Sequence, residues 1–589
     1  MTSRLTGSQV KALPWRKGVL ICAAPDIIYA EDTDGDGKAD KVEKLYSGFG
    51  TENYQARVNS LQYGLDGWVY GSCGLFGGNI TCAKTGKTVA LGDRDFRIKP
   101  DTGELEPATG RTQQGRVRDD RGNWFGCDNS NLVRHYVLED HYLRRNPHVA
   151  YPNTSVNVAH GNRVFPIKAD AQRFALSGPL GGVTAACGLG IYRDDLLGPD
   201  FTGNAFTCET VNLLVTRTVL KPSGSTFRGE RAPDEADREF LASADGWFRP
   251  VHAVTGPDGG LWVADMYRYL IEHPRWIPPA DLAKIDTRAG AGLGRIYRVR
   301  PADKPLRKWE RLDKLDTAGL VAALDSPNGW QRDMAMMMLI WKNDEKAKEP
   351  LERLVRGAKS GLTRMQALCT LGAMGQSTGE LVEPSTRDKD MGVRRHALRL
   401  FEPHLQNGAH IIIALLQLAE EKADVQVRLQ LACALGQWPQ DDSAILLRQL
   451  VLNHIDDPYL TAAVTSSLNK DNVALVSTHL RARAENEPPH ELIRNVFATA
   501  AGWTAGRHCR SCSRPCESAR TGRSGPGNSR RSRARSTRWS GRASRGASSR
   551  PKFASRLSRW SRSRGRSCRR TSRPKSTPSP RFRFSLATP

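Results

Sequence analysis

One short pattern recurs in the first half of the chain and constrains the fold more than any other feature. Each copy has an apolar strand, a tight turn containing Gly with Asp or Arg, and an aromatic-rich strand, which predicts a β-hairpin. The copies are 61–71 (LQYGLDGWVYG), 117–126 (VRDDRGNWFG) and 253–264 (AVTGPDGGLWVA), and two further blades are expected at 18–48 and 188–220. Such recurrence is typical of the blades of a β-propeller, which we place at 1–300. A β-sandwich is the alternative, but the irregular spacing favours the propeller.

The hydrophobic period changes from two to 3.6 after a charged linker at 301–316. Arg332, Arg364, Arg395 and Arg428 stand at the heads of similar apolar helices, and a fifth unit starts near Tyr459. The spacings of 32, 31, 33 and 31 residues predict HEAT-like helix pairs over 317–505. A plain helical bundle is the alternative.

The positive charge of the chain is concentrated at one end. From Arg507 to Pro589 there are 23 Arg, two Lys and one acid, so this segment carries +24 of the total of +25. It contains no Ile, Val, Met or Tyr and cannot bury enough apolar surface to fold, so we expect 506–589 to be a disordered basic tail. The abrupt change of composition indicates an out-of-frame reading. The alternative is a genuine arm that binds nucleic acid, but its aromatic residues are scattered, which makes nucleic acid an unexpected partner.

An acidic loop at 32–43 carries the most specific motif of the chain. Oxygen ligands stand at loop positions 1, 3, 5, 9 and 12, with Gly at 6 and a main-chain carbonyl at 7, which is the spacing that Ca²⁺ requires. The predicted ligands are Asp32, Asp34, Asp36, Lys38 through its carbonyl, Asp40 and Glu43. Because both flanks are strand-like, we expect the loop at a hairpin tip and the ion in a structural role. The alternative is an acidic turn that binds only water.

Four longer segments give the chain a resemblance to a known family. They are 15–40 (WRKGVLICAAPDIIYAEDTDGDGKAD), 58–78 (VNSLQYGLDGWVYGSCGLFGG), 121–131 (RGNWFGCDNSN) and 240–278 (FLASADGWFRPVHAVTGPDGGLWVADMYRYLIEHPRWIP). They resemble the membrane-bound dehydrogenase-type proteins of planctomycete-like bacteria. Those proteins join a propeller similar to quinoprotein glucose/sorbosone dehydrogenases to HEAT-like repeats and a c-type haem domain with a Cys-x-x-Cys-His motif. For this chain the resemblance implies a six-bladed type of propeller that is incomplete, pyrroloquinoline quinone (PQQ), a sugar or alcohol substrate, and a periplasmic or cell-envelope location.

Two departures from that family bear on activity. Its sugar dehydrogenases carry a catalytic His shortly before the first GxDG hairpin, and Ala56 stands at that position, where a methyl group cannot act as a base. The near match to the haem motif is Cys509–Cys512, followed by Ser513 in place of the axial His. We therefore expect no haem in this chain and little or no dehydrogenase activity.

Polar residues at strand ends beside the hairpins are candidates for a site at the central channel of the propeller. The catalytic candidates are His252, Arg249 and Asp265, and His135 or His273 could also replace the missing base. The cofactor-binding candidates are Arg57, Asn59, Tyr267 and Arg268. The alternative for each is a structural role, in which the side chain satisfies buried main-chain groups between blades.

Two functions from different classes follow. The propeller is either an oxidoreductase that handles sugars or alcohols, or a carbohydrate- or protein-binding scaffold whose repeats present a concave surface to a protein partner. Ala56 favours the scaffold for this chain, and the resemblance favours the enzyme for its relatives. No apolar run approaches the ~20 residues of a membrane-spanning helix, and the first residues lack a signal-peptide pattern. Buried thiols and disulfides remain equal alternatives for the cysteines.

Overall fold

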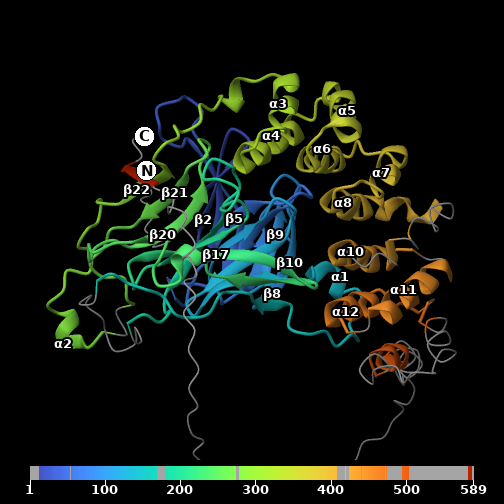
Figure 1. The fold of residues 1–589 in the computed structure, drawn as a ribbon, viewed down its shortest axis with the longest axis horizontal. Helices are drawn as coiled ribbons and strands as arrows, with labels where there is room; N and C mark the ends of the chain where they lie inside the picture. Colours follow the sequence, from blue (N-terminus) through green and yellow to red (C-terminus); the bar gives the residue numbers. More distant parts are fainter. Residues whose placement is uncertain are drawn as a thin grey trace, which may run out of the picture. The chain divides into compact units, whose positions relative to one another are not determined.

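The structure, a computed structural model, describes two parts of the chain, 12–502 and 582–586. Within the first part it leaves out 54, 169–179, 274–276, 408–414, 416–417, 420–423, 439–440, 455, 471, 474–475 and 477–493. Antiparallel sheets come first and helices follow, as the colours of Figure 1 show. No helix among the described residues has the length and apolar character needed to cross a membrane.

The described strands form five antiparallel sheets. The first has the order β1 (Ala12–Trp15), β2 (Gly18–Ala23), β3 (Asp26–Glu31), β4 (Lys41–Phe49), β7 (Gly78–Cys82) and β8 (Thr88–Gly92). The second has the order β10 (Glu104–Ala108), β9 (Asp95–Lys99), β6 (Val69–Ser72) and β5 (Asn59–Tyr63). The third contains β11 (Gln114–Arg118), β12 (Trp124–Asp128), β13 (Asn131–Tyr136) and β14 (Ser155–Asn157).

The remaining two sheets complete the set. The fourth contains β15 (Ala186–Ile191), β16 (Ala205–Glu209), β17 (Leu214–Ser223) and β18 (Thr226–Glu230), with β19 (Leu241–Ala242) beside β17. The fifth contains β20 (Pro250–Thr255), β21 (Leu261–Asp265), β22 (Arg295–Pro301) and β23 (Phe582–Leu586). Strand β23 lies within 506–589, so the structure differs from the expected disorder at 582–586, where an apolar residue at every second position suits a strand. The three hairpins and the two further blades expected from the sequence each fall in a different sheet.

The first strands of successive sheets lie next to one another, with β5 beside β1 and β11, and β15 beside β11 and β20. Sheets that meet at their first strands and extend outward form the blades of a β-propeller. The propeller expected from the sequence is therefore confirmed, with five blades in the described part of the chain.

The three recurring hairpins share one turn, in which a main-chain N–H bonds the carbonyl four residues on. The bonds are Gly64 to Trp68 at 2.8 Å, Asp119 to Asn123 at 3.0 Å and Gly256 to Gly260 at 2.8 Å. In each turn an Asp side chain accepts from the side chain four residues later, and the pairs are Asp66–Tyr70, Asp119–Asn123 and Asp258–Trp262. In each hairpin an Asp side chain therefore fixes the turn to a residue at or directly before the start of the second strand.

The described helices of the second region follow the linker. They are α3 (Thr317–Ala323), α4 (Gly329–Lys342), α5 (Lys348–Gly357), α6 (Gly361–Ala373), α7 (Gly379–Ser385), α8 (Met391–Phe401), α10 (Val425–Leu435), α11 (Asp441–Asn453) and α12 (Pro458–Ser466). Helices α4, α6, α8, α10 and α12 pack in series as one layer, and α3, α5, α7 and α11 pack on them. This is the helical-repeat solenoid expected from the period of 3.6.

An arginine occupies the fourth residue of α4, α6, α8 and α10, and these residues are Arg332, Arg364, Arg394 and Arg428. The third differs from the expectation, which placed Arg395 in this series. Arg394 donates to Asp424 at 2.5 Å, and Arg364 donates to Asp388 at 2.6 Å. These arginines therefore link one repeat to the loop that begins the next, and Asp424 also caps α10.

The layer of α4, α6 and α8 contacts the hairpin turns of the propeller. Arg395 donates to the side chain of Asn123 at 2.6 Å, and Arg399 donates to the carbonyl of Leu65 at 3.1 Å. Gln331 of α4 donates to the carbonyl of Pro257 at 3.0 Å. The three recurring hairpins are therefore covered at their turns by the helical repeats.

A buried ion network joins the two regions below α4. Asp333 accepts from Arg118 at 2.6 Å and from Arg193 at 2.6 and 3.1 Å. Asp120 accepts from Arg193 at 2.6 Å and from Arg332 at 2.5 Å. All five side chains are at most 16% exposed, so the network fixes the first repeat to the third and fourth blades. This network was not predicted from the sequence.

Candidate functional site

The acidic loop lies at the tip of the hairpin between β3 and β4, as expected. Asp32 accepts from the main-chain N–H groups of Gly35 at 2.7 Å and Gly37 at 2.9 Å, and Asp34 accepts from Asp36 N–H at 3.1 Å. Gly35 and Gly37 have φ of +85° and +84°, a region that side chains with a Cβ rarely adopt. The glycines and these bonds therefore curl the loop around its own carboxylates.

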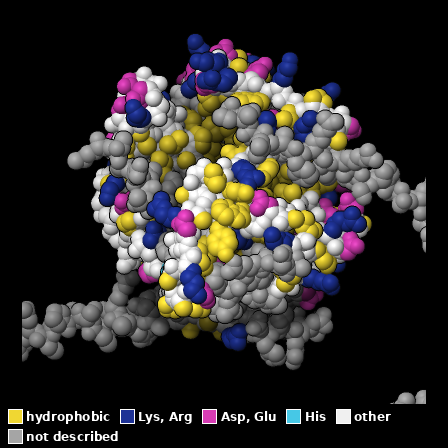
Figure 2. All heavy atoms as spheres, turned by 90° about the vertical axis from the view of Figure 1, so that its left-hand side faces the viewer, with side chains coloured by type: hydrophobic (Ala, Val, Ile, Leu, Met, Phe, Trp, Pro, Cys, Tyr) yellow, Lys and Arg dark blue, Asp and Glu magenta, His cyan; other side chains and the backbone are white. Residues whose placement is uncertain are grey.

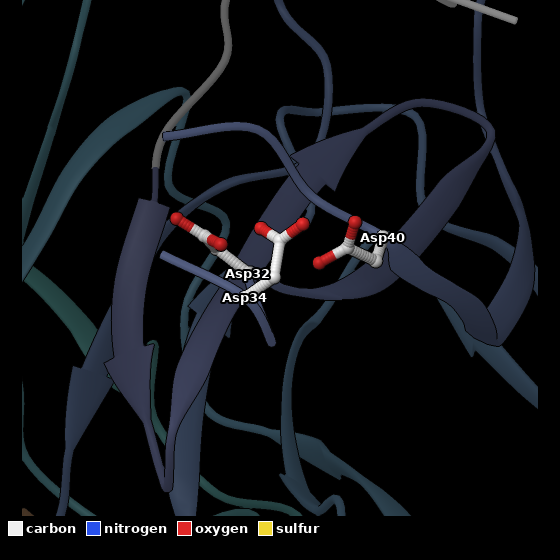
Figure 3. Close-up of side chains that lie close together, drawn as sticks. All are labelled: Asp32, Asp34 and Asp40. Atoms are coloured by element: carbon white, nitrogen blue, oxygen red, sulfur yellow. The ribbon is translucent and has the colours of Figure 1, made fainter. Parts of the chain in front are cut away.

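Asp32, Asp34 and Asp40 each bring one carboxylate oxygen within 4.8 Å of the others (Figure 3). Ca²⁺ binds oxygen at 2.3–2.6 Å, so two ligands of one ion lie at most about 5 Å apart. Asp40 also accepts from the N–H and hydroxyl of Thr33 at 2.8 and 2.9 Å, and these bonds lower its pKa. Three carboxylate oxygens at this separation fit a single hard cation.

The other predicted ligands have different partners in the structure. Asp36 accepts from Lys38 N–H at 2.7 Å and pairs with the Lys38 ammonium at 3.2 Å. Glu43 lies on β4 and pairs with Lys41 at 3.2 Å. The structure therefore groups three of the six predicted ligands, and the complete set with the Lys38 carbonyl stays a prediction.

The second candidate region is the end of the propeller where β5, β11, β15 and β20 begin. All four strands have a register shift near this end, at 59–62, 114–117, 187–190 and 250–252. The shifted residues Ser60, Gly115 and Gly188 have φ of +57°, +83° and +56°. These bulges bring the backbones of neighbouring strands together, because a Cβ on Gly188 would lie 1.9 Å from the carbonyl oxygen of Val251.

The cavity beyond the bulges is small. Its volume is about 50 Å³, and it is closed on the solenoid side by Trp330 and Asp333 of α4. His252 lines it together with Gln62 and Arg193. Sites for organic ligands and cofactors usually enclose about 300–1,000 Å³, so this cavity has room only for small species such as water.

Arg249 and Asp265 hold the main chain of the fifth blade. The Arg249 guanidinium donates to the carbonyls of Thr210 at 3.0 Å, Arg268 at 3.0 Å and Tyr269 at 2.9 Å. One Asp265 oxygen accepts from the N–H groups of Arg249 and Tyr267, both at 2.8 Å. The other Asp265 oxygen is buried and has no hydrogen-bond partner among the described residues, and burial raises the pKa of this carboxyl.

The cofactor-binding candidates also contact protein groups. Asn59 donates to the carbonyls of Arg57 at 2.7 Å and Gln113 at 2.8 Å. Arg57 donates to the carbonyl of Thr51 at 3.3 Å, and Arg268 donates to the carbonyl of Gly290. The Arg295 guanidinium lies over the Tyr267 ring, with its central carbon 3.4 Å from the centre of that ring. Most of these contacts therefore fit a structural role, in which the side chain satisfies main-chain groups between blades.

Three positions considered for the catalytic base differ in their surroundings. Ala56 is 1% exposed. His135 lies between Phe125 and Phe227, 5.2 and 4.9 Å between ring centres, and burial lowers its pKa to about 3. His135 is therefore a neutral core residue, whereas His252 lines the axial cavity.

Eight cysteines lie in the described part of the chain, and all are buried. Cys187 and Cys208 are register partners on β15 and β16. Burial raises the pKa of Cys73 and of Cys127 to about 12. The Cys73 and Cys127 thiols are accordingly un-ionised near neutral pH and pack as small apolar groups. Cys509, Cys512 and Ser513 lie outside the described residues.

The fold and the loop together define a propeller–solenoid protein with an acidic loop suited to a cation. Residues 10–303 match the family model of a domain of unknown function, DUF7133. No curated protein matches the sequence.

Solved structures give distant likenesses. The soluble aldose sugar dehydrogenase from Escherichia coli is 13% identical, with a TM-score of 0.24, over 44% of this chain and 74% of that one. A glucose dehydrogenase is 12% identical, with a TM-score of 0.24, over 44% and 74%. A luciferin-regenerating enzyme is 10% identical, with a TM-score of 0.27, over 51% and 81%.

Proposed function

We propose that this chain is a binding scaffold built on a dehydrogenase-like propeller, stabilised by one structural Ca²⁺, and that it does not oxidise sugars. The observation that carries the proposal is the use of the candidate side chains. Arg249 and Asn59 direct their donors to main-chain carbonyls, and the position of the expected base is the buried methyl group of Ala56. Side chains committed in this way hold blades together and cannot move a substrate proton.

PQQ, the cofactor implied by the resemblance, does not fit the residues present at this face. A planar tricyclic acid needs a slot of several hundred Å³ with free donors for its carboxylates. The Arg249 guanidinium is bonded to three main-chain carbonyls, and the cavity of about 50 Å³ that His252 lines is too small for such a molecule. We therefore assign no step to a quinone.

In this proposal the main role of the solenoid is to stabilise the propeller. The helices that carry Gln331, Arg395 and Arg399 lie against the hairpin turns. A protein partner would therefore bind the other layer, formed by α3, α5, α7 and α11. A periplasmic or cell-envelope location remains part of the proposal through the resemblance.

The test uses the purified chain with Ca²⁺, PQQ, an artificial electron acceptor and a panel of aldoses and alcohols. We expect no turnover above the rate without protein and no saturable PQQ binding by calorimetry. A soluble aldose sugar dehydrogenase assayed in parallel serves as the positive control. Saturable PQQ binding with substrate-dependent reduction of the acceptor would overturn the proposal.

The second candidate function is an oxidoreductase, and the unpartnered Asp265 oxygen favours it. A buried carboxylate oxygen without a hydrogen-bond partner is unusual in a folded protein. Because burial also raises the pKa of Asp265, this carboxyl has the properties of a proton-transfer group. Loss of turnover in Asp265→Asn, with turnover present in the unaltered chain, would be the signature of this function.

A further inference from the structure

The outer edge of the fifth blade is completed by a distant part of the chain. The third and fourth sheets are each built from one continuous stretch of sequence. In the fifth sheet β20, β21 and β22 come from one stretch, but the fourth strand, β23, comes from Phe582–Leu586. After β22 the chain continues into the linker and α3, so that stretch supplies no further strand for this edge.

The register of β23 on β22 follows the apolar pattern of both segments. Phe582, Phe584 and Leu586 occupy the positions opposite Pro301, Val299 and Tyr297. Val299 is 0% exposed and belongs with Tyr297 to the core between the fourth and fifth blades. Because strand residues alternate between the two faces, the three apolar residues of β23 occupy register positions on the face that carries Val299.

The sequence of the tail is selective at this point. From Arg507 onward, 582–586 is the one place where three large apolar residues stand at alternate positions. A slip by one residue would place arginine and serine on the core side instead. One pair opposes this register, since Arg583 stands opposite Arg300 and like charges directly across a sheet are unfavourable.

We propose that the β22 edge is a strand-binding site that takes an extended segment with apolar residues at alternate positions, and that Phe582–Leu586 of the same chain is its occupant. An unpaired sheet edge exposes main-chain donors and acceptors, and an added strand satisfies them while alternate side chains set specificity. Ile296, 45% exposed on β22, and Leu293, 55% exposed just before it, add apolar surface at this edge. The space-filling view from the side of β20–β22 shows hydrophobic side chains gathered near the centre, with charged residues around them (Figure 2).

The first experiment compares hydrogen exchange in the full chain and in the double variant Phe584→Pro/Ser585→Pro. Adjacent strand residues point their N–H groups to opposite sides, so one of the two prolines removes a bond to β22 wherever the register begins. We expect peptides that cover 295–301 to exchange about tenfold faster or more, since an edge freed of its partner opens locally. Ser576→Pro/Thr577→Pro, outside the strand, is the matched control and should leave this exchange unchanged.

The second experiment supplies the strand in trans. A labelled peptide of residues 580–589 should bind the full-length double-proline variant and bind the unaltered chain at least about tenfold more weakly, because the tethered segment competes at a high effective concentration. A scrambled peptide of the same composition tests whether charge alone causes binding.

Faster exchange at 295–301 together with sequence-dependent peptide binding supports the strand-binding site. Unchanged exchange in the double-proline variant overturns it, and so does equal binding of the scrambled peptide. A concentration-dependent dimer of the unaltered chain, in which 582–586 of one copy binds the β22 edge of another, would overturn the assignment of the occupant to the same chain.

Discussion

The ion network between propeller and solenoid gives the sharpest test of the structure. Asp333→Asn keeps the shape of the side chain but leaves Arg118 and Arg193 buried without their shared carboxylate, which lies 2.6 Å from each. Removal of one partner from a buried charge network costs on the order of 3–5 kcal/mol, because the remaining charges stay desolvated. We expect the Tm to fall by roughly 5 °C or more. A fall no larger than that of the control Asp313→Asn, whose partner Arg311 is 66% exposed, would refute the reasoning.

The same variant predicts a pH dependence. The arginines hold the pKa of Asp333 below its ordinary value of 3.8, so its contribution to stability is present above that pH and is lost as the pH falls toward the folded pKa. The difference in Tm between Asp333→Asn and the unaltered chain should therefore be constant from pH 5 to 8 and shrink below about pH 4. Limited proteolysis of the linker at 302–316, measured in parallel, should be faster in the variant because the first repeat is less firmly held.

Three further predictions concern other parts of the chain. Ca²⁺ should raise the Tm and a chelator should reverse this rise. The rise should be absent in Asp34→Ala/Asp36→Ala and present in the exposed control Asp237→Ala. An unchanged Tm with Ca²⁺ would contradict the prediction that the acidic loop binds Ca²⁺. Ala56→His should restore no dehydrogenase turnover, because the position is 1% exposed and packed; robust aldose oxidation would show the opposite. Burial raises the pKa of Glu235 to about 7, above its value in the unfolded chain, so the free energy of unfolding falls as the pH rises from about 5 to 7. Glu235→Gln should remove on the order of 2–3 kcal/mol of that fall, which urea denaturation at each pH measures.

The blades were predictable because their signal is local. The turn bonds of Asp66, Asp119 and Asp258 all join residues four apart, so a short window of sequence contains the whole device. The contact of these turns with the helices was not predictable, since the partners of Leu65 and Asn123 lie more than 270 residues away. Nothing in a local pattern distinguishes a turn that faces water from one that faces a helix.

The repeat arginines show the limit of a period read from sequence. Arg394 and Arg395 are adjacent and both fit a spacing near 32 residues, but they point to different partners. Arg394 bonds Asp424 in the next repeat, and Arg395 bonds Asn123 of the propeller. A one-residue difference on a helix is a rotation of about 100°, so the period identifies the repeat but not the side chain that links it.

The position of the acidic loop at a hairpin tip is confirmed, whereas Ca²⁺ binding stays a prediction. The hairpin tip and the grouping of Asp32, Asp34 and Asp40 follow from strand-like flanks and loop spacing. Asp36 and Glu43 instead pair with Lys38 and Lys41, which are cations close in sequence. The two lysines supply the positive charge for these carboxylates within the chain, and an ion would have to displace them.

The axial face could be located from the sequence, but the use of its residues could not. Arg249 bonds carbonyls 19, 20 and 39 residues away, and the same guanidinium would suit an anionic ligand equally well. A comparison between two blades distinguishes a structural role from a ligand-binding role. Glu209, at the end of β16, has both oxygens bonded, to Thr184 and Ala185 N–H on one side and to Asn212 on the other. Asp265, at the corresponding end of β21, has one oxygen bonded and one without a partner among the described residues, so of these two carboxylates Asp265 is the one that keeps an oxygen for a ligand.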